Sequence, residues 1–387
     1  MGIFDKKKKQ MKLDEVTTFL DQLRLPTALV FTPINLEEEK KKFFDSDTYN
    51  PVFKYRGVAN KNDKILKFLS TVEEISDVDP RISSFYIDLI ASKKEANELI
   101  KAVGNNELVT EISTARFGLP FAKLFRNSCR VLRGNVSNYN LIESSKKVDT
   151  DELLGYDEIS EVFRKVFSIL GLDDWEVAES MNIAKNSVKV GIKRKQILVD
   201  KNIVRSKLKL KKTIVHEVGT HVLRSVNGSN SGFPALGNAT LPEYLDVEEG
   251  LATWNESNMD LLTENWLRKK VALVYAIYVG QKMTFRELYN CLYAILPKFS
   301  AFSTTYRVKR GLSDTSKPGI YAKDVVYFRG FKKVSARLEK NPLLYNMLYS
   351  GKITFKQCEW VEDGLIPKAT NVPSKEEWLS IFKKVGL

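Results

Sequence analysis

Apolar residues recur at helical spacing along most of the chain, and one short region instead alternates apolar and polar residues. Residues 63–153 are expected to be mostly helical, and residues 153–170 and 206–226 form two further expected helices. Residues 187–192 are expected to form a half-exposed strand, in which Val188, Val190 and Ile192 alternate with Lys189 and the following Lys193. Residues 197–199 form its expected partner. The pattern predicts a predominantly helical α+β fold.

The same pattern divides the chain into an arm and one large domain. Residues 1–45 include four consecutive lysines at 6–9 and are expected to form a basic, helical or mobile N-terminal arm. The remainder, 46–387, contains no internal repeat and is expected to act as one functional unit, with the polar segment 144–152 as the link between two lobes. Within it we expect a helical lobe at 46–150 and a second lobe at 151–387.

The net charge and the cysteine content indicate which binding partners and which cellular compartment to expect for this chain. Lys+Arg 61 against Asp+Glu 48 gives a net charge of +13, a field that attracts nucleic acid, anionic membranes or acidic polypeptides. Cys129, Cys291 and Cys358 are widely spaced and are expected to be reduced core thiols of a cytoplasmic protein. The longest apolar run, 271–279, is shorter than the roughly 20 residues of a membrane span, so it is expected to be a buried helix.

The candidate chemistry lies in the second long helix, which contains the pattern HExxxH. His216 and His221 are the 2 histidines of the chain, and Glu217 directly follows the first of them. Neutral imidazole is a preferred zinc ligand, and a glutamate beside the metal is placed to act as general base on a bound water. The motif predicts one Zn²⁺ per chain, against the alternative of two histidines with a purely structural role.

The spacing of the two histidines raises a geometric problem. Histidines four apart on an α-helix lie about 40° apart around the axis, whereas histidines five apart diverge by roughly 140°. A π-bulge absorbs one extra residue, and such bulges concentrate at functional sites. Gly219, inside the motif, is the residue best able to tolerate that distortion. We therefore expect a local π-helical turn between His216 and His221.

A catalytic zinc needs a third protein ligand, which is expected on the next helix, after Pro242. Glu248 and Glu249 are adjacent there and are both candidates. Either glutamate alone is also explained as an acidic residue that complements the helix dipole. From the residues themselves, the choice between the two stays open.

Several further residues are candidates for supporting roles. Tyr327 and Arg307 are candidates to donate to the developing oxyanion, because both histidines are already committed to the metal. Arg224, one turn beyond His221, is expected to orient Glu249 or contact substrate, or else to complement the C-terminus of its helix. The strand at 187–192 is expected either to pair with an extended substrate or to be an ordinary edge strand.

The motifs resemble those of the microtubule-associated tyrosine carboxypeptidases and their bacterial relatives, in which an HExxxH helix and a later EEGLA or QEGLA segment bind one zinc. The resemblance extends over nearly everything after residue 45. It implies a zincin-like metallopeptidase fold, with the glutamate matching Glu249 as third ligand, since the position matching Glu248 can be Gln. The segments that carry it are HEVGTH at 216–221, EEGLA at 248–252, Asn50-Pro51, RFGLP at 116–120, Asn227-Gly228, YRVKRG at 306–311 and KDVVY at 323–327.

The resemblance also implies which end of a substrate is recognised. The RVKRG segment recurs in those carboxypeptidases, whose substrates end in a free carboxylate. Lys309 and Arg310 are therefore expected to bind that carboxylate, with Arg307 turned toward the scissile carbonyl. Dipeptidyl-peptidase III enzymes also use HExxxH, but with Gly immediately before the second histidine, where this chain has Thr220.

The expected function is that of a zinc metallocarboxypeptidase. It is expected to remove a C-terminal residue, with an aromatic residue among the options, from peptides or proteins with acidic tails. One alternative is a zinc aminopeptidase or dipeptidyl peptidase. The other is a basic nucleic-acid-binding protein without catalysis, but no zinc finger or RNA-binding motif is present, so no nucleic-acid partner is expected.

Overall fold

A computed structural model describes residues 9–25, 30–57, 61–137, 139, 141, 152–181 and 186–387. Lys6, Lys7 and Lys8 of the expected basic arm lie outside the described residues. The chain divides into two compact units. The first comprises Met1–Gly134, Thr240–Glu243 and Arg268–Val326, and the second comprises Asn135–Ala239, Tyr244–Leu267 and Tyr327–Leu387.

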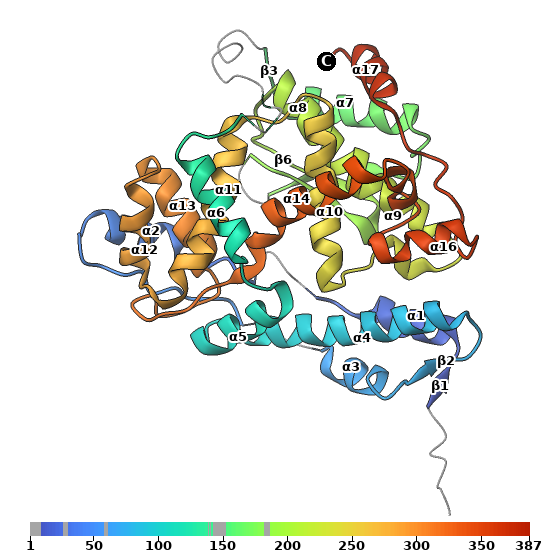
Figure 1. Cartoon of the computed structure of the whole chain (residues 1–387), viewed down its shortest axis with the longest axis horizontal. Coiled ribbons are helices and arrows are strands. Elements are labelled where there is room, and N and C mark those ends of the chain that lie inside the picture. Colours follow the sequence, from blue (N-terminus) through green and yellow to red (C-terminus); the bar gives the residue numbers. More distant parts are fainter. Residues whose placement is uncertain are drawn as a thin grey trace, which may run out of the picture. The chain divides into compact units, whose positions relative to one another are not determined.

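The first unit consists mainly of helices (Figure 1). Two of them belong to the N-terminal 45 residues, so the described part of the expected arm is largely helical. The apolar run at 271–279 is a buried part of a helix, as predicted. The elements are β1 (Gln10–Met11), α1 (Leu13–Gln22), α2 (Leu36–Phe44), α3 (Asp63–Leu69), β2 (Glu74–Ile75), α4 (Pro80–Lys101), α5 (Asn106–Phe117), α6 (Ala122–Leu132), α11 (Glu264–Val279), η4 (Gly280–Lys282), α12 (Phe285–Tyr293), α13 (Lys298–Lys309) and η5 (Ala322–Asp324).

The second unit combines helices with short strands, which confirms the predominantly helical α+β fold. The candidate metal-binding residues all lie on its helices. Its elements are β3 (Leu153–Leu154), α7 (Tyr156–Ile169), β4 (Glu176–Ser180), β5 (Val188–Gly191), η1 (Ile192–Arg194), β6 (Gln196–Asp200), β7 (Arg205–Ser206), α8 (Lys207–Thr213), η2 (Ile214–Val222), α9 (Leu223–Ser229), η3 (Pro234–Gly237), α10 (Pro242–Asn258), α14 (Val325–Lys340), α15 (Leu344–Leu348), η6 (Phe355–Gln357), α16 (Cys358–Glu362) and α17 (Lys375–Lys384).

A three-stranded sheet with the order β4-β6-β5 precedes the helix that contains the HExxxH motif. β5 pairs with β6 in antiparallel register, with Val188 opposite Val199, which confirms the predicted strand pair and leaves β5 at an edge. β4 pairs with β6 in parallel and was not predicted from the sequence. The reason is that β4 buries none of its residues fully, so it lacks a clear apolar alternation.

The predicted helix at 206–226 is one continuous helical segment whose middle part is π-helical. Ser206 caps its start by accepting a hydrogen bond from the Lys209 amide. α8 then leads into the π-helix η2, which contains the HExxxH motif, and α9 continues it to Ser229. The expected π-helical turn between His216 and His221 is thereby confirmed.

Close packing against α14 fixes the position of α10, the helix expected to carry the third ligand. A Cβ on Gly250 would lie 2.4 Å from the backbone of Gly330, and a Cβ on Gly330 would lie 2.1 Å from the Asp246 carbonyl oxygen. Arg329 adds two 2.9 Å hydrogen bonds to the Asp246 carboxylate. Only glycine permits this backbone approach, so the EEGLA segment has its glycine for packing reasons.

Within the described ranges, no helix has both the length and the apolar character needed to cross a bilayer. The three cysteines are free, with Cys358 buried and with Cys129 and Cys291 partly exposed. The expectation of three core thiols is therefore correct for Cys358 alone.

Candidate metal centre

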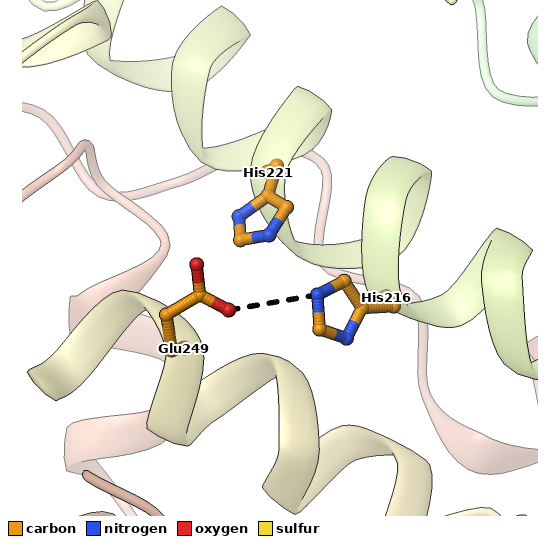
Figure 2. A group of neighbouring side chains, drawn as sticks. All are labelled: His216, His221 and Glu249. Carbon is orange, nitrogen blue, oxygen red and sulfur yellow. Dashed lines mark ion pairs between the residues drawn. The ribbon is translucent and has the colours of Figure 1, made fainter. Parts of the chain in front are cut away.

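Two helices of the second unit bring together the side chains expected to bind zinc. His216 and His221 project from η2, and Glu249 projects toward them from α10 (Figure 2). One ligand atom from each residue lies within 4.8 Å of the others, and His216 Nε2 is 3.7 Å from Glu249 Oε2. Among the described residues, this is the one group of three or more His, Cys, Asp and Glu side chains with such spacing.

The π-helical turn explains how histidines five residues apart share one site. Its hydrogen bonds run from each residue to the fifth residue before it, so five residues complete about one turn. The two imidazole centroids are 4.9 Å apart, and the rings are inclined by 80°. In an α-helix the same two side chains would diverge by roughly 140°. The backbone distortion therefore creates the convergence.

A second carboxylate orients His216. Its Nδ1 lies 2.8 Å from Glu256 Oε1, and the other oxygen of Glu256 lies 3.0 Å from Lys212 Nζ. Burial opposes the charged imidazolium, but the hydrogen bond and charge of Glu256 outweigh it and raise the pKa of His216 to about 9. With Nδ1 engaged by Glu256, Nε2 is the nitrogen that faces Glu249.

A similar arrangement orients His221. Its Nδ1 lies 2.7 Å from Glu248 Oε1, and Glu248 also accepts hydrogen bonds from Arg224 and Lys352. Burial of Glu248 would raise the pKa of its carboxyl, but Lys352, Arg224 and His221 together hold that pKa well below its ordinary value. Glu248 is thus a buried anion with both oxygens occupied. Its partners leave Glu249 as the glutamate that is available to a metal.

The donor set fits zinc. Two imidazoles and one carboxylate are typical of catalytic zinc sites, which keep one position for water or substrate. Metal-ligating histidines nearly always donate their other N–H to a carboxylate or carbonyl, and here each histidine faces its own glutamate. His216, His221 and Glu249 would hold the ion, and Glu256 and Glu248 would fix the two rings.

Glu217, the expected general base, is half-buried and follows His216 in the π-helix. Its charge acts on Arg205, whose guanidinium is mostly buried. Burial lowers the pKa of Arg205, and the charge of Glu217 opposes that shift. Arg205 donates to the hydroxyl of Thr213, one turn before Glu217, and to the Asn186 carbonyl oxygen at 3.2 Å. Glu217 therefore has a buried positive charge in its surroundings.

Arg224 does not have the expected position. Its side chain has 0% exposure and donates to the carbonyl oxygens of Leu348 at 2.8 Å and Ile353 at 2.6 Å as well as to Glu248. A guanidinium without exposed surface does not contact substrate, and it orients Glu248 in place of the expected Glu249. Tyr327 is half-buried near the start of α14, in the same unit as the histidines. Its role as oxyanion donor stays a prediction.

The RVKRG segment belongs to the first unit, and its three cations differ in their surroundings. The segment is the end of helix α13 and not an extended strand, so Arg307 and Arg310 share a face and both bind Asp324, at 2.7 and 3.1 Å. Lys309 has 0% exposure and donates to the carbonyl oxygens of Gly280 at 3.0 Å, Gly319 at 2.6 Å and Met283. Lys309 is therefore wrong as a residue of the carboxylate pocket. The carboxylate-binding role of Arg310 and the role of Arg307 at the scissile carbonyl stay predictions.

Sequence reasoning missed the residues that support the metal ligands. Glu256 carried a usable signal, because it follows Glu249 by two helical turns and so lies on the same helix face. Lys352 carried none, because its contact with Glu248 depends on which segments meet in the folded chain. Lys212 is one turn before His216, but lysines are so frequent in this part of the sequence that it was not distinctive.

The fold and the paired histidines define a helical α+β protein with a candidate HExxxH metal centre, and sequence comparison identifies its family. The profile of the microtubule-associated tyrosine carboxypeptidase family matches residues 41–382. The chain therefore belongs to that family.

Individual relatives are distant. Microtubule-associated tyrosine carboxypeptidase 1 of Mus musculus is 23% identical over 347 residues, which cover 88% of this chain and 63% of the mouse protein. The proteins of the same name from Rattus norvegicus and Homo sapiens are 29% identical over 163 and 175 residues, or 41% and 44% of this chain and 34% and 36% of those proteins. The chain thus spans less than two thirds of the length of these relatives.

Proposed function

We propose that this chain is a zinc-dependent carboxypeptidase that removes the C-terminal residue of a peptide or protein. The observation that carries the proposal is the convergence of His216, His221 and Glu249 within 4.8 Å, with each histidine oriented by a further glutamate. Membership of a family whose named relatives are tyrosine carboxypeptidases supports the same chemistry and makes an aromatic C-terminal residue a reasonable first substrate.

Zinc held by His216, His221 and Glu249 would supply Lewis-acid chemistry and a water of lowered pKa at this site. Glu217 accepts a proton from that water and returns it to the amine of the departing residue, as general base and then general acid. Glu256 and Glu248 keep the histidine Nδ1 protons in place, so that Nε2 of each ring stays free for the metal. Tyr327 is the proposed donor to the oxyanion.

The charge of the second unit favours acidic substrates. Residues 186–213, which contain β5, β6 and α8 and lead into η2, include ten lysines and arginines and a single acidic residue, Asp200. Such a basic stretch attracts acidic peptides, and the attraction weakens as salt screens it. We propose a cytoplasmic protein tail rich in acidic residues as the substrate class.

Two measurements test the proposal. Elemental analysis of the purified protein is expected to give one zinc per chain in the wild type and little in His221→Ala. A peptide with a free C-terminus is expected to lose its last residue, and the same peptide as a C-terminal amide is expected to stay intact. Equal cleavage of both peptides, or release of N-terminal residues, would exclude a carboxypeptidase while leaving the metal site in place.

A further inference from the structure

The hydrogen-bond pattern at the end of the π-helix moves one backbone donor away from the Gly219 carbonyl, which accepts a side-chain hydrogen bond from outside the helix. In an α-helix the Leu223 N–H would donate to the Gly219 carbonyl, four residues earlier. Here it donates to the carbonyl oxygens of Val218 and Thr220. The Gly219 carbonyl instead accepts a hydrogen bond of 2.7 Å from the hydroxyl of Tyr349, which follows α15.

Tyr349 belongs to a buried polar network that contacts the π-helix at two adjacent residues. The Asn255 side-chain amide donates to the Tyr349 hydroxyl and to the Thr220 hydroxyl, each at 2.8 Å. The Thr220 hydroxyl donates at 3.3 Å to the Val215 carbonyl, five residues earlier, which is the spacing of the π-helix. Asn255, Thr220 and Tyr349 are each at most 5% exposed.

These contacts lie at the backbone groups whose hydrogen bonds differ between the π-helix and the α-helix. A buried carbonyl without a partner is costly, so the chain adopts the conformation in which every such group is paired. The π-helical pattern moves the Leu223 N–H away from the Gly219 carbonyl, and the Tyr349 hydroxyl donates to that carbonyl. In an α-helix the Leu223 N–H would donate to the Gly219 carbonyl and compete there with the hydroxyl. The hydroxyl therefore favours the π-helix over the α-helix.

We infer that Tyr349, Asn255 and Thr220 form a polar clamp that holds the HExxxH segment in its π-helical form and so positions His221 beside His216. They are positioning residues, since they act through the backbone between the two histidines. The inference rests on the proposed zinc site and adds to it the cause of its geometry. It predicts that loss of the clamp weakens metal binding in a chain that remains folded.

The test is Tyr349→Phe, with Tyr345→Phe as the matched control. Both substitutions remove one tyrosine hydroxyl, but the Tyr345 hydroxyl bonds to the Tyr349 hydroxyl at 3.3 Å and does not contact the π-helix. Zinc affinity is measured by chelator competition, and the coordination geometry by the visible spectrum of the Co²⁺-loaded protein. Tyr349→Phe should bind zinc about 10–100-fold more weakly, the effect usual for supporting residues of a metal ligand. It should also alter the Co²⁺ spectrum.

Amide hydrogen exchange in the metal-free protein gives a readout that needs no bound ion. Tyr349→Phe should change protection of the Leu223 amide and its neighbours, because the donor pattern there changes, whereas the Tyr345→Phe protein should match the wild type. Thr220→Val, which removes the second contact with little change of volume, should act in the same direction.

The outcomes separate this inference from the proposed function. If the wild type binds no zinc, the proposed function fails and the exchange experiment still tests the clamp. If the wild type binds zinc and Tyr349→Phe and Thr220→Val keep its affinity, Co²⁺ spectrum and exchange pattern, the clamp is overturned and the zinc site stands.

Discussion

Replacing Glu248 and Glu249 separately by glutamine should give opposite effects on metal binding and on folding. The two residues are adjacent on α10, yet Glu249 faces the histidine rings and Glu248 is buried against two cations. Glutamine has nearly the same volume, but it removes the charge and replaces one acceptor oxygen by an NH2 donor. We expect Glu249→Gln to lose zinc with little change in the stability of the metal-free protein, and Glu248→Gln to lose stability while still binding zinc.

The magnitude for Glu249 follows from its position as a direct ligand. Structural zinc sites bind with about 10–16 kcal/mol shared over four ligands, so one anionic ligand accounts for about 3 kcal/mol. At about 1.4 kcal/mol per factor of ten, its loss weakens zinc binding by more than about a hundredfold. In the metal-free protein its nearest charged partner is His216 Nε2, 3.7 Å away. A partly exposed pair of this kind contributes at most about 1 kcal/mol to folding.

The magnitude for Glu248 follows from the charges left behind. Arg224 has 0% exposed side-chain surface and Lys352 has 7%, and both bind the Glu248 carboxylate. Removing one partner of a buried ion pair costs about 3–5 kcal/mol of folding free energy. A glutamine oxygen still accepts the hydrogen bond from His221 Nδ1, so zinc affinity should fall by only about tenfold.

The assay combines chelator competition for zinc with urea unfolding of each protein after metal removal. Glu249→Gln should unfold at nearly the wild-type urea concentration and Glu248→Gln at a clearly lower one. The reasoning is refuted if Glu249→Gln keeps wild-type zinc affinity. It is also refuted if Glu248→Gln loses its zinc at unchanged metal-free stability, because Glu248 would then be the third ligand.

Three further predictions concern the helix itself and the first unit. Glu217→Gln should keep its zinc and lose about 10²–10⁴-fold in turnover, because the amide does not accept the proton; near-normal peptide hydrolysis would assign the base elsewhere. Gly219→Ala should destabilise the protein by about 1–3 kcal/mol, because its Cβ would lie 2.8 Å from the Trp378 ring. Adding Trp378→Phe to the Gly219→Ala protein should recover part of the lost stability, measured by thermal unfolding. If the effects of the two substitutions simply add, the Cβ added at position 219 does not clash with the Trp378 ring. Burial lowers the pKa of Lys309 to about 7 from the ordinary 10.5, so the unfolded chain keeps a proton that the folded chain releases between these values. The free energy of unfolding should therefore rise with pH over that range more steeply in the wild type than in Lys309→Met. Parallel pH profiles of the two proteins would contradict the lowered pKa of Lys309.

Local patterns were sufficient for the long helices before residue 226, the β5–β6 pair and the π-helical turn. The turn was predictable because two histidines five residues apart have no common face on an α-helix. A π-helical turn is the local change of backbone that brings them to the same face. The glycine of the motif was predicted for its backbone freedom. The structure adds a different reason, since Gly219 has no room for a Cβ against Trp378 of the C-terminal helix α17. That contact joins residues far apart in the sequence and leaves no local signal.

The RVKRG segment shows where charge patterns mislead. Three cations within four residues suggest a binding surface for an anion, but the helix places them in different environments. Lys309 points inward to three backbone carbonyl groups, and Arg307 and Arg310 converge on Asp324. Asp324 comes from the KDVVY segment, so the RVKRG and KDVVY segments are partners of each other in this chain. This pairing gives the two arginines a structural role that does not require contact with a substrate.

The carboxylates of α10 show why the candidate metal centre could be predicted only partly from the sequence. Glu248, Glu249 and Glu256 are chemically identical, and periodicity places Glu249 and Glu256 on one face. Their roles depend on the charged side chains beside them. Glu248 forms ion pairs with Arg224 and Lys352, and one oxygen of Glu256 pairs with Lys212. Among the described ion pairs, no lysine or arginine pairs with Glu249. A carboxylate that is already paired with a lysine or arginine is less available to a metal ion. The distribution of cations therefore favours Glu249 as the proposed third ligand, and those cations come from segments that only the folded chain brings to α10.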